Sequence, residues 1–230
     1  MTCTDNALIA RLQGADRIRF LDLCERVPLN RMECLFQSEE AINHVYFPVS
    51  GFVCLLAHEP DDAELIVAMV GREGMLDPRA ALGVAQTPMR ALVQSEGWAW
   101  RMPVKVFQQQ LEASAALVRL MDRYVAVVLN QSVTLALCLH YHEVGPRLAR
   151  WLLMSQDRTG SDHCQATQES LSAMLGVRRV SVTTAANALQ RRGAISYHRG
   201  NIHLLDRMVL EQVACSCYLT DRESYEAMMR

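Results

Sequence analysis

The stretch from residue 113 to about residue 142 constrains the fold most, because it contains neither glycine nor proline. At a rise of about 1.5 Å per residue, one helix over it would be about 45 Å long. Its apolar residues cover almost every face, so the helix must be buried on several sides. One side can pack on a domain of the same chain. Because only a small domain follows, we expect the other side to pack against a second copy in a homodimer. The alternative is a helix buried within one large domain.

The sequence shows no sign of export or of membrane contact. Residues 1–20 carry acidic side chains and no apolar run, unlike a signal or transit peptide. The longest uncharged stretch, residues 124–139, is short for a bilayer and contains four polar side chains. We therefore expect a cytoplasmic protein with no membrane partner.

The part before the long helix has the pattern of a β-rich domain. Residues 6–36 show helical apolar spacing with short breaks. Residues 42–102 show short apolar runs separated by Gly and Pro, which is typical of a sandwich or barrel. We expect turns at Phe47–Pro48 and at Ser50–Gly51, and an acidic hairpin tip at residues 59–62.

A domain boundary is predicted where the helical pattern ends, at Gly145 and Pro146. It would separate residues 1–143, which hold the β-rich part and the long helix, from a smaller domain at residues 144–230. Strands and helices occupy separate stretches, so the predicted fold class is α+β.

Positive charge is concentrated in the smaller domain, although the whole chain has a net charge of −2. Residues 1–143 carry −5, residues 144–210 carry +5 and residues 211–230 carry −2. Every basic side chain between residues 144 and 210 is an arginine. Such an asymmetry is expected where one part of a protein meets phosphate groups.

Residues 164–205 carry the signals of a helix, a tight turn and a second helix. Thr167 is a good N-cap for a first helix with i, i+3, i+4 apolar spacing, and Gly176 supplies the turn. A second helix over about residues 178–192 would bury a stripe formed by Val182, Ala185, Ala186 and Leu189. Its other faces are polar and basic, and we predict that it enters the major groove of duplex DNA. The residues expected to contact DNA there are Arg178, Arg179, Val180, Ser181, Thr183, Thr184, Asn187 and Arg191.

A β-hairpin is predicted after Gly193, with alternating apolar residues on either side of His198–Asn201 and Arg199 at its tip. Helix, turn, helix and basic hairpin in this order form a winged helix, which together with the local charge favours DNA binding. The alternative is a winged-helix protein-interaction module without sequence-specific DNA binding.

Two segments resemble the Crp/Fnr family of bacterial transcription regulators: GPRLARWLLMSQDR at residues 145–158 and the winged helix at residues 167–206. The resemblance covers nearly the whole chain. It implies a cyclic-nucleotide-binding-like β-roll, a long dimerisation helix and a C-terminal winged helix-turn-helix domain. It also implies a regulator that is not an enzyme and binds a near-palindromic operator as a homodimer, with RNA polymerase as a further candidate partner.

The base-reading positions of the family match Arg179, Val180 and Thr184 of this chain. The family has Arg, Glu and Arg there, so only Arg179 retains the chemistry. Arginine can pair with guanine through two hydrogen bonds, whereas valine can only touch a thymine methyl group. The expected phosphate contacts come from Arg178, Ser181 and Arg199.

The family's effector pocket is similar to residues 71–94, but its ligands differ. Cyclic-nucleotide binders hold the ribose with Glu and the phosphate with Arg and Ser, and this chain has Arg72, Thr87 and Pro88 at those positions. Glu73 and Arg90 lie close by in the sequence. The candidate pocket residues are therefore Arg72, Glu73, Thr87 and Arg90. Without the phosphate-binding guanidinium, we do not expect cyclic AMP to bind.

No metal and no cofactor are expected from the sequence. Its eight cysteines are predicted to be reduced, and the clustered N-terminal cysteines of the family's oxygen sensors are absent. Cys215 and Cys217 are a lone pair whose side chains would diverge on a helix, so all are interpreted as small buried hydrophobes. A cupin-like metalloprotein is the other alternative. It would need several converging ligands, and residues 42–102 hold only His44 and His58.

Overall fold

The computed structural model describes residues 5–58 and 64–230, so the predicted acidic tip at residues 59–62 lies outside the described residues. The first part of the chain holds η1 (Ile9–Arg11), α1 (Gly14–Asp22), β1 (Glu25–Leu29), β2 (Cys34–Phe36), β3 (His44–His58), β4 (Glu64–Val70), η2 (Pro78–Leu82) and β5 (Met89–Pro103), where η denotes a short 3-10 helix. Three helices follow, α2 (Val104–Ala113), α3 (Ala115–Tyr141) and α4 (Val144–Thr159). The last elements are β6 (His163–Gln165), α5 (Gln168–Leu175), α6 (Arg179–Arg191), β7 (Ile195–His198), β8 (Asn201–Leu204), α7 (Arg207–Val213) and α8 (Cys217–Met228).

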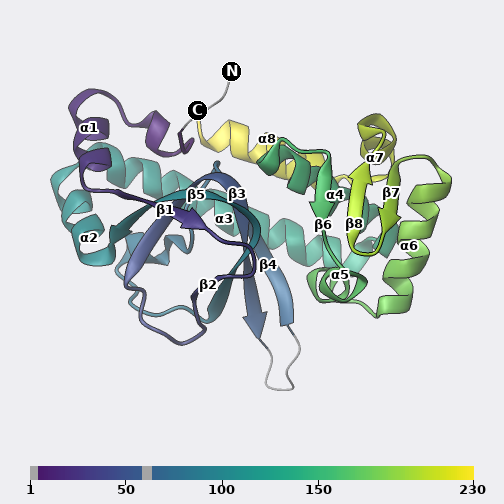
Figure 1. Ribbon diagram of the computed structural model, residues 1–230. Coiled ribbons are helices and arrows are strands. Elements are labelled where there is room, and N and C mark those ends of the chain that lie inside the picture. Colours follow the sequence, from purple (N-terminus) through teal and green to yellow (C-terminus); the bar gives the residue numbers. More distant parts are fainter. Residues whose placement is uncertain (1–4, 59–63) are drawn as a thin grey trace.

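An antiparallel sheet forms the first domain, with strands in the order β1-β5-β3-β4 and with β2 also paired to β5. The sheet curls over the long helix α3, which continues toward the winged helix at the other side of Figure 1. The predicted α+β fold class, with an antiparallel sheet, a long helix and a C-terminal helix-turn-helix, is confirmed.

The two predicted turns at residues 47–51 are wrong, because these residues lie inside the single long strand β3. The pairing of β3 with β5 shifts register at this place, which is the mark of β-bulges. Gly51 has a φ of +68°, and a Cβ on Gly97 of the facing strand would lie 2.1 Å from the carbonyl oxygen of Ser50. Gly51 and Gly97 therefore permit a bend in two paired strands, not a chain reversal.

The helical spacing predicted over residues 6–36 holds only as far as α1. Strands β1 and β2 follow within that range, and both pair with β5. These two short strands are stabilised by backbone hydrogen bonds to β5. The spacing of apolar residues along the chain does not reveal such pairing.

The long helix α3 matches the predicted range 113–142 to within two residues at each end. It begins where the Ser114 hydroxyl accepts a hydrogen bond from the Leu117 amide at 3.2 Å. One face packs into the first domain, where the Tyr124 hydroxyl donates to the Met75 carbonyl at 3.1 Å. By length and composition alone α3 could also cross a membrane, but the core helix of a water-soluble protein passes the same test.

Helix α4 starts at Val144, with Gly145 and Pro146 inside its first turn. A proline is tolerated there because its missing N–H has no intrahelical partner in any case. The chain therefore bends at His142 and Glu143, just before the predicted boundary residues. The division into residues 1–143 and 144–230 stays a prediction, because α8 returns from the smaller domain to pack along α3.

Candidate nucleic-acid interface

Local sequence signals position the two helices of the helix-turn-helix. The Thr167 hydroxyl accepts a hydrogen bond from the Ser170 amide at 3.0 Å and so caps α5, as predicted. Gly176 ends α5 with a φ of +60°, a conformation that costs glycine little. Helix α6 then runs from Arg179 to Arg191 with Arg178 as its N-cap, one residue shorter at each end than the predicted 178–192.

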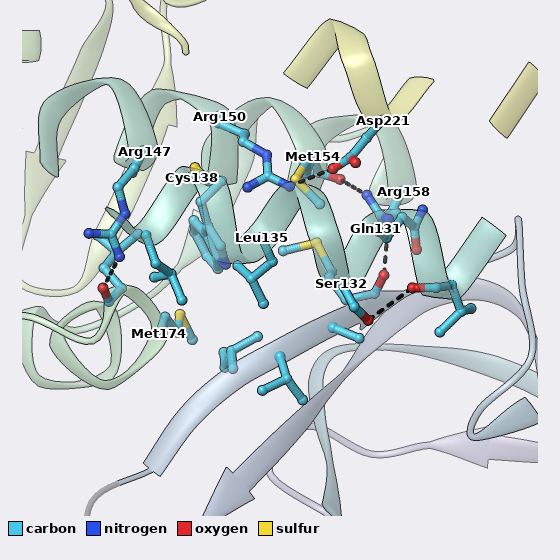
Figure 2. A pocket seen from close by; sticks show the side chains of 18 residues that line it. Gln131, Ser132, Leu135, Cys138, Arg147, Arg150, Met154, Arg158, Met174 and Asp221 are labelled. Atoms are coloured by element: carbon cyan, nitrogen blue, oxygen red, sulfur yellow. Dashed lines mark hydrogen bonds and ion pairs between the residues drawn. The ribbon is translucent and has the colours of Figure 1, made fainter. Parts of the chain in front are cut away.

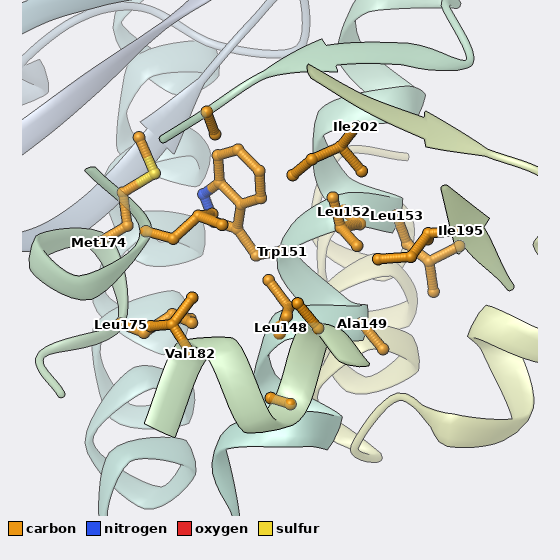
Figure 3. Close-up of a cluster of buried hydrophobic side chains, with 14 of the residues drawn as sticks. Leu148, Ala149, Trp151, Leu152, Leu153, Met174, Leu175, Val182, Ile195 and Ile202 are labelled. Atoms are coloured by element: carbon orange, nitrogen blue, oxygen red, sulfur yellow. The ribbon is translucent and has the colours of Figure 1, made fainter. Parts of the chain in front are cut away.

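A buried stripe fixes the orientation of α6. Its residues are the predicted Val182, Ala185, Ala186 and Leu189, and all are buried. They share one apolar core with α4 and the hairpin β7–β8. Figure 3 shows Val182 directed at Leu148 of α4, with Trp151 beside them and Ile195 and Ile202 at the hairpin side. Because this stripe is buried on one side, the opposite side of α6 faces solvent.

The solvent-facing side of α6 carries most of the residues predicted to contact DNA. Arg178, Arg179, Val180, Thr184, Asn187 and Arg191 are exposed, while Ser181 and Thr183 are half-buried. Val180 is 76% exposed, which is a large exposure for a branched apolar side chain at a helix N-terminus. The hydroxyls of Thr183 and Thr184 donate to the helix carbonyls of Arg179 and Val180, each at 3.0 Å.

The hairpin β7–β8 has the predicted tip. His198 pairs with Asn201, and Arg199 and Gly200 form the turn with φ values of +46° and +81°. The Ala166 amide donates to the Gly200 carbonyl at 2.9 Å, so the tip lies beside the start of α5. In Figure 1 the tip and the N-terminal end of α6 lie at the same end of the winged helix.

The arginines of residues 144–210 divide into two groups. Arg147, Arg150, Arg158 and Arg207 are partly or fully buried and bind carboxylates or carbonyl oxygens of the same chain. Within the described residues, Arg178, Arg179, Arg191, Arg192 and Arg199 form no salt bridge, and all five are exposed. Arg192 was not among the predicted contacts, although it directly follows Arg191. The uncompensated charge lies on α6 and the hairpin tip, where an anionic partner can reach it.

Each of the four candidate effector-pocket residues bonds to a described residue outside that set. The Glu73 carboxylate pairs with Arg158 at 2.8 Å, and Arg90 pairs with Glu64 at 2.7 Å. Thr87 is buried and accepts a hydrogen bond from Arg79 at 2.8 Å. The backbone carbonyl of Arg72 accepts a hydrogen bond from the Ala7 amide at 2.7 Å.

The guanidinium of Arg79, which donates a hydrogen bond to Thr87, is already paired with an acidic residue. Asp77 is buried, and its two carboxylate oxygens accept hydrogen bonds from Arg79 at 2.7 and 2.8 Å. The family resemblance did not predict this pair. A phosphate at this place would meet the Asp77 carboxylate, which lowers the positive potential that a phosphate needs.

A mainly apolar pocket lies instead between β4, α3 and α4. Figure 2 shows Leu135 and Cys138 of α3 lining it together with Met154 and Arg158 of α4. At its rim Arg150 forms an ion pair with Asp221 of α8. The pocket therefore lies where the long helix, the sheet and the winged helix meet.

The fold brings together one group of side chains that was not predicted as a group. Cys138, His142, Cys215 and Cys217 lie close together, with all four ligand atoms within 4.8 Å of one another. The signals were a Cys and a His four residues apart on one helix face and a Cys-x-Cys pair. The pair was expected to diverge on a helix, but Cys215 precedes α8 and Cys217 begins it.

Two protein-family models match the sequence. A model of the cyclic nucleotide-binding domain matches residues 26–114, and a model of the Crp-like helix-turn-helix domain matches residues 146–213. Together they cover the sheet with α2 and the whole of the helix-turn-helix with its hairpin. The comparison with curated proteins finds no match.

Several solved structures share the fold over nearly their whole length. A putative transcriptional regulator of the Crp/Fnr family from Eubacterium rectale has a TM-score of 0.71 at 17% identity, with 90% of this chain and 97% of that chain covered. FixK2 from Bradyrhizobium japonicum has a TM-score of 0.70 at 16% identity, covering 84% of this chain and 98% of that chain. The c-di-GMP responsive global regulator CLP from Xanthomonas campestris has a TM-score of 0.67 at 16% identity, covering 84% and 100% respectively.

Proposed function

The chain belongs to the Crp/Fnr family of DNA-binding transcription regulators, and from this premise we propose that it binds a near-palindromic duplex operator as a homodimer through α6. The observation that carries the proposal is the exposed face of α6, which is basic and free of salt bridges within the described residues. Regulators of this family are typically cytoplasmic, and we propose the same for this protein.

Base reading in this proposal depends on the first turn of α6. Arg179 would pair with O6 and N7 of a guanine, and the exposed Val180 would contact a thymine methyl group. Thr184 lies one turn beyond Val180 on the same face and would contact the next base edge. Arg178, Ser181 and Arg199 would hold phosphates, with Thr183, Asn187 and Arg191 along the same groove.

The homodimer would form through α3. One side of this helix packs into its own chain, but a second side leaves Leu129, Val133, Leu137 and Tyr141 exposed. These residues follow one another at intervals of four, so they form one apolar stripe along the C-terminal half of the helix. We refer to these four residues as the α3 stripe. A second copy of the same stripe, related by a two-fold axis, would remove it from water.

Winged helices can also bind other proteins, and a DNA-binding measurement distinguishes that function from DNA recognition. We expect the purified protein to bind short random-sequence duplexes at low salt, with an affinity that falls steeply as salt is added. Replacing Arg199 by Ala should lower the slope of log K against log salt by about one. Fluorescence anisotropy on labelled duplexes measures both. A protein that leaves random duplex unbound at low salt would favour the docking function.

A further inference from the structure

Four side chains of the kinds that bind metal ions lie close together at the C-terminal end of α3, the helix proposed to form the dimer. Cys138 lies in the last turn of α3, and His142 is the first residue after this helix. Cys215 lies just before α8, and Cys217 is the first residue of α8. We propose that Cys138, His142, Cys215 and Cys217 form a tetrahedral site for one zinc-type divalent ion per chain.

The distances fit a single small ion. The Sγ atoms of Cys138 and Cys215 are 3.6 Å apart, and Cys217 Sγ lies 3.5 Å from His142 Nδ1. A tetrahedral zinc ion with bonds of about 2.3 Å to sulfur and about 2.0–2.1 Å to nitrogen requires ligand atoms about 3.5–3.8 Å apart. The largest separation in the group is 4.8 Å, so small side-chain rotations would complete the geometry.

The backbone sets up this convergence. Cys138 and His142 are four residues apart, and the His142 amide donates to the Cys138 carbonyl at 3.2 Å, so both side chains lie on one helix face. Cys217 begins α8, and the Cys215 amide donates to the Pro146 carbonyl of α4 at 3.4 Å. Three separate elements therefore fix the ligands before any ion binds, which is the preorganisation a metal site needs.

Metal binds the thiolate form of cysteine, so three coordinating cysteines would bring negative charge into this buried group. Arg150 is buried beside the group and contributes positive charge there, and it also forms an ion pair with Asp221. The three cysteines are buried, while His142 is half-exposed and leaves a route from solvent.

Two other chemistries could use the same cysteines. A disulfide between Cys138 and Cys215 would require a two-electron oxidant and would leave Cys217 and His142 without a role. An iron–sulfur cluster distributes its four ligands over two or four iron atoms, which spreads the ligands farther apart than one ion does. Sulfur and nitrogen atoms gathered this closely favour a mononuclear ion.

A bound ion would also tie together parts of the molecule that matter for regulation. The site joins the end of α3 to the start of α8, beside the bend at His142 and Glu143 that leads into α4. Occupancy would therefore hold the winged helix in one position relative to α3. This consequence rests on the proposed function, whereas metal binding itself does not.

The test uses the full-length, untagged protein, stripped of metal with a chelator under reducing conditions. Zinc is then titrated in competition with a chromogenic chelator, and cobalt is added to a second sample. We expect one zinc per chain, and with cobalt a sulfur-to-metal charge-transfer band together with the intense visible bands of tetrahedral coordination. The variants Cys217→Ser and His142→Ala should each bind zinc at least tenfold more weakly.

Cys34→Ser is the matched control, because Cys34 lies in β2 and its thiol donates only to the Phe36 carbonyl. It should bind zinc like the wild type. Zinc should raise the thermal midpoint of the wild type and of Cys34→Ser but not of Cys217→Ser, and circular dichroism checks that each variant is folded. Absence of stoichiometric zinc binding by the reduced wild type, a visible iron–sulfur spectrum, or unchanged binding by both ligand variants would overturn the proposal. DNA binding is measured separately, so failure of one proposal leaves the other standing.

Discussion

At the scale of single residues, Arg179 carries the sharpest prediction of base recognition. It is exposed at the first position of α6 and free of salt bridges within the described chain. If it pairs with guanine, Arg179→Ala should cost about 1–3 kcal/mol and relax the preference at one base position in each half-site. Arg199→Ala in the hairpin should weaken binding to all DNA sequences alike. Binding of both variants to a set of single-base operator mutants measures the difference, and an equal loss on every sequence for Arg179→Ala would contradict base reading.

Asp77 and Arg79 lead to a prediction about the effector. Their paired charges stand next to Thr87, where a cyclic-nucleotide phosphate would need an unpaired guanidinium. We expect calorimetry to detect no cyclic AMP binding at micromolar concentration, and DNA affinity to stay the same when the nucleotide is added. Micromolar binding with a stoichiometry of one per chain would refute this.

Features of single residues could be predicted where they depend on neighbours in the sequence. They could not be predicted where they depend on distant segments that the fold brings together. The cap at Thr167 and the turn at Gly176 follow from neighbours in sequence, and both are found as predicted. The group around Cys138 depends on α8 folding back onto α3, which joins residues far apart in the chain. The Asp77–Arg79 pair depends on side-chain conformations that the sequence does not show.

At the scale of elements, α3 is both the most predictable part of the fold and the proposed dimer interface. Val133, in the middle of the α3 stripe, is 62% exposed, whereas Val128 packs toward the pocket and core of its own chain. Val133→Glu should weaken the dimer by about tenfold or more, or ~1.4 kcal/mol, because two charges would be buried at the interface. Sedimentation across a concentration series measures this.

Ile18 of α1 supplies the control for that experiment, since it is 64% exposed and lies outside the α3 stripe. Ile18→Glu should leave the sedimentation of the wild type unchanged. A wild-type protein that is monomeric at micromolar concentration would rule out the α3 dimer.

The strands were predicted less well than the helices. Pro48 and Gly51 indicated turns, but both lie in β3, where they accompany bulges in its pairing with β5. Periodicity cannot tell these cases apart, because both interrupt a run of apolar residues. Only the partner strand shows that Gly51 and Gly97 face one another.

At the scale of the whole molecule, an ion pair between Arg150 and Asp221 joins α4 to α8. Both side chains are nearly buried, so removing one leaves the other charge without a partner. Asp221→Ala should lower the free energy of unfolding by about 3–5 kcal/mol. Urea unfolding measures it, with the exposed Glu223→Ala on the same helix as control. Equal stability of the two variants would show that this contact contributes nothing to holding α8 in place.

The central claim is that two copies of α6 read one operator together, and its most direct test is selection of bound sequences from a randomised duplex library. Two recognition helices in successive major grooves require inverted half-sites centred about 34 Å apart, close to one helical turn. We therefore expect the selected sequences to be near-palindromes with that spacing, and to lose the preference at one position per half-site when Arg179→Ala replaces the wild type. Selected sites without two-fold symmetry, or no enrichment over the starting library, would contradict the account.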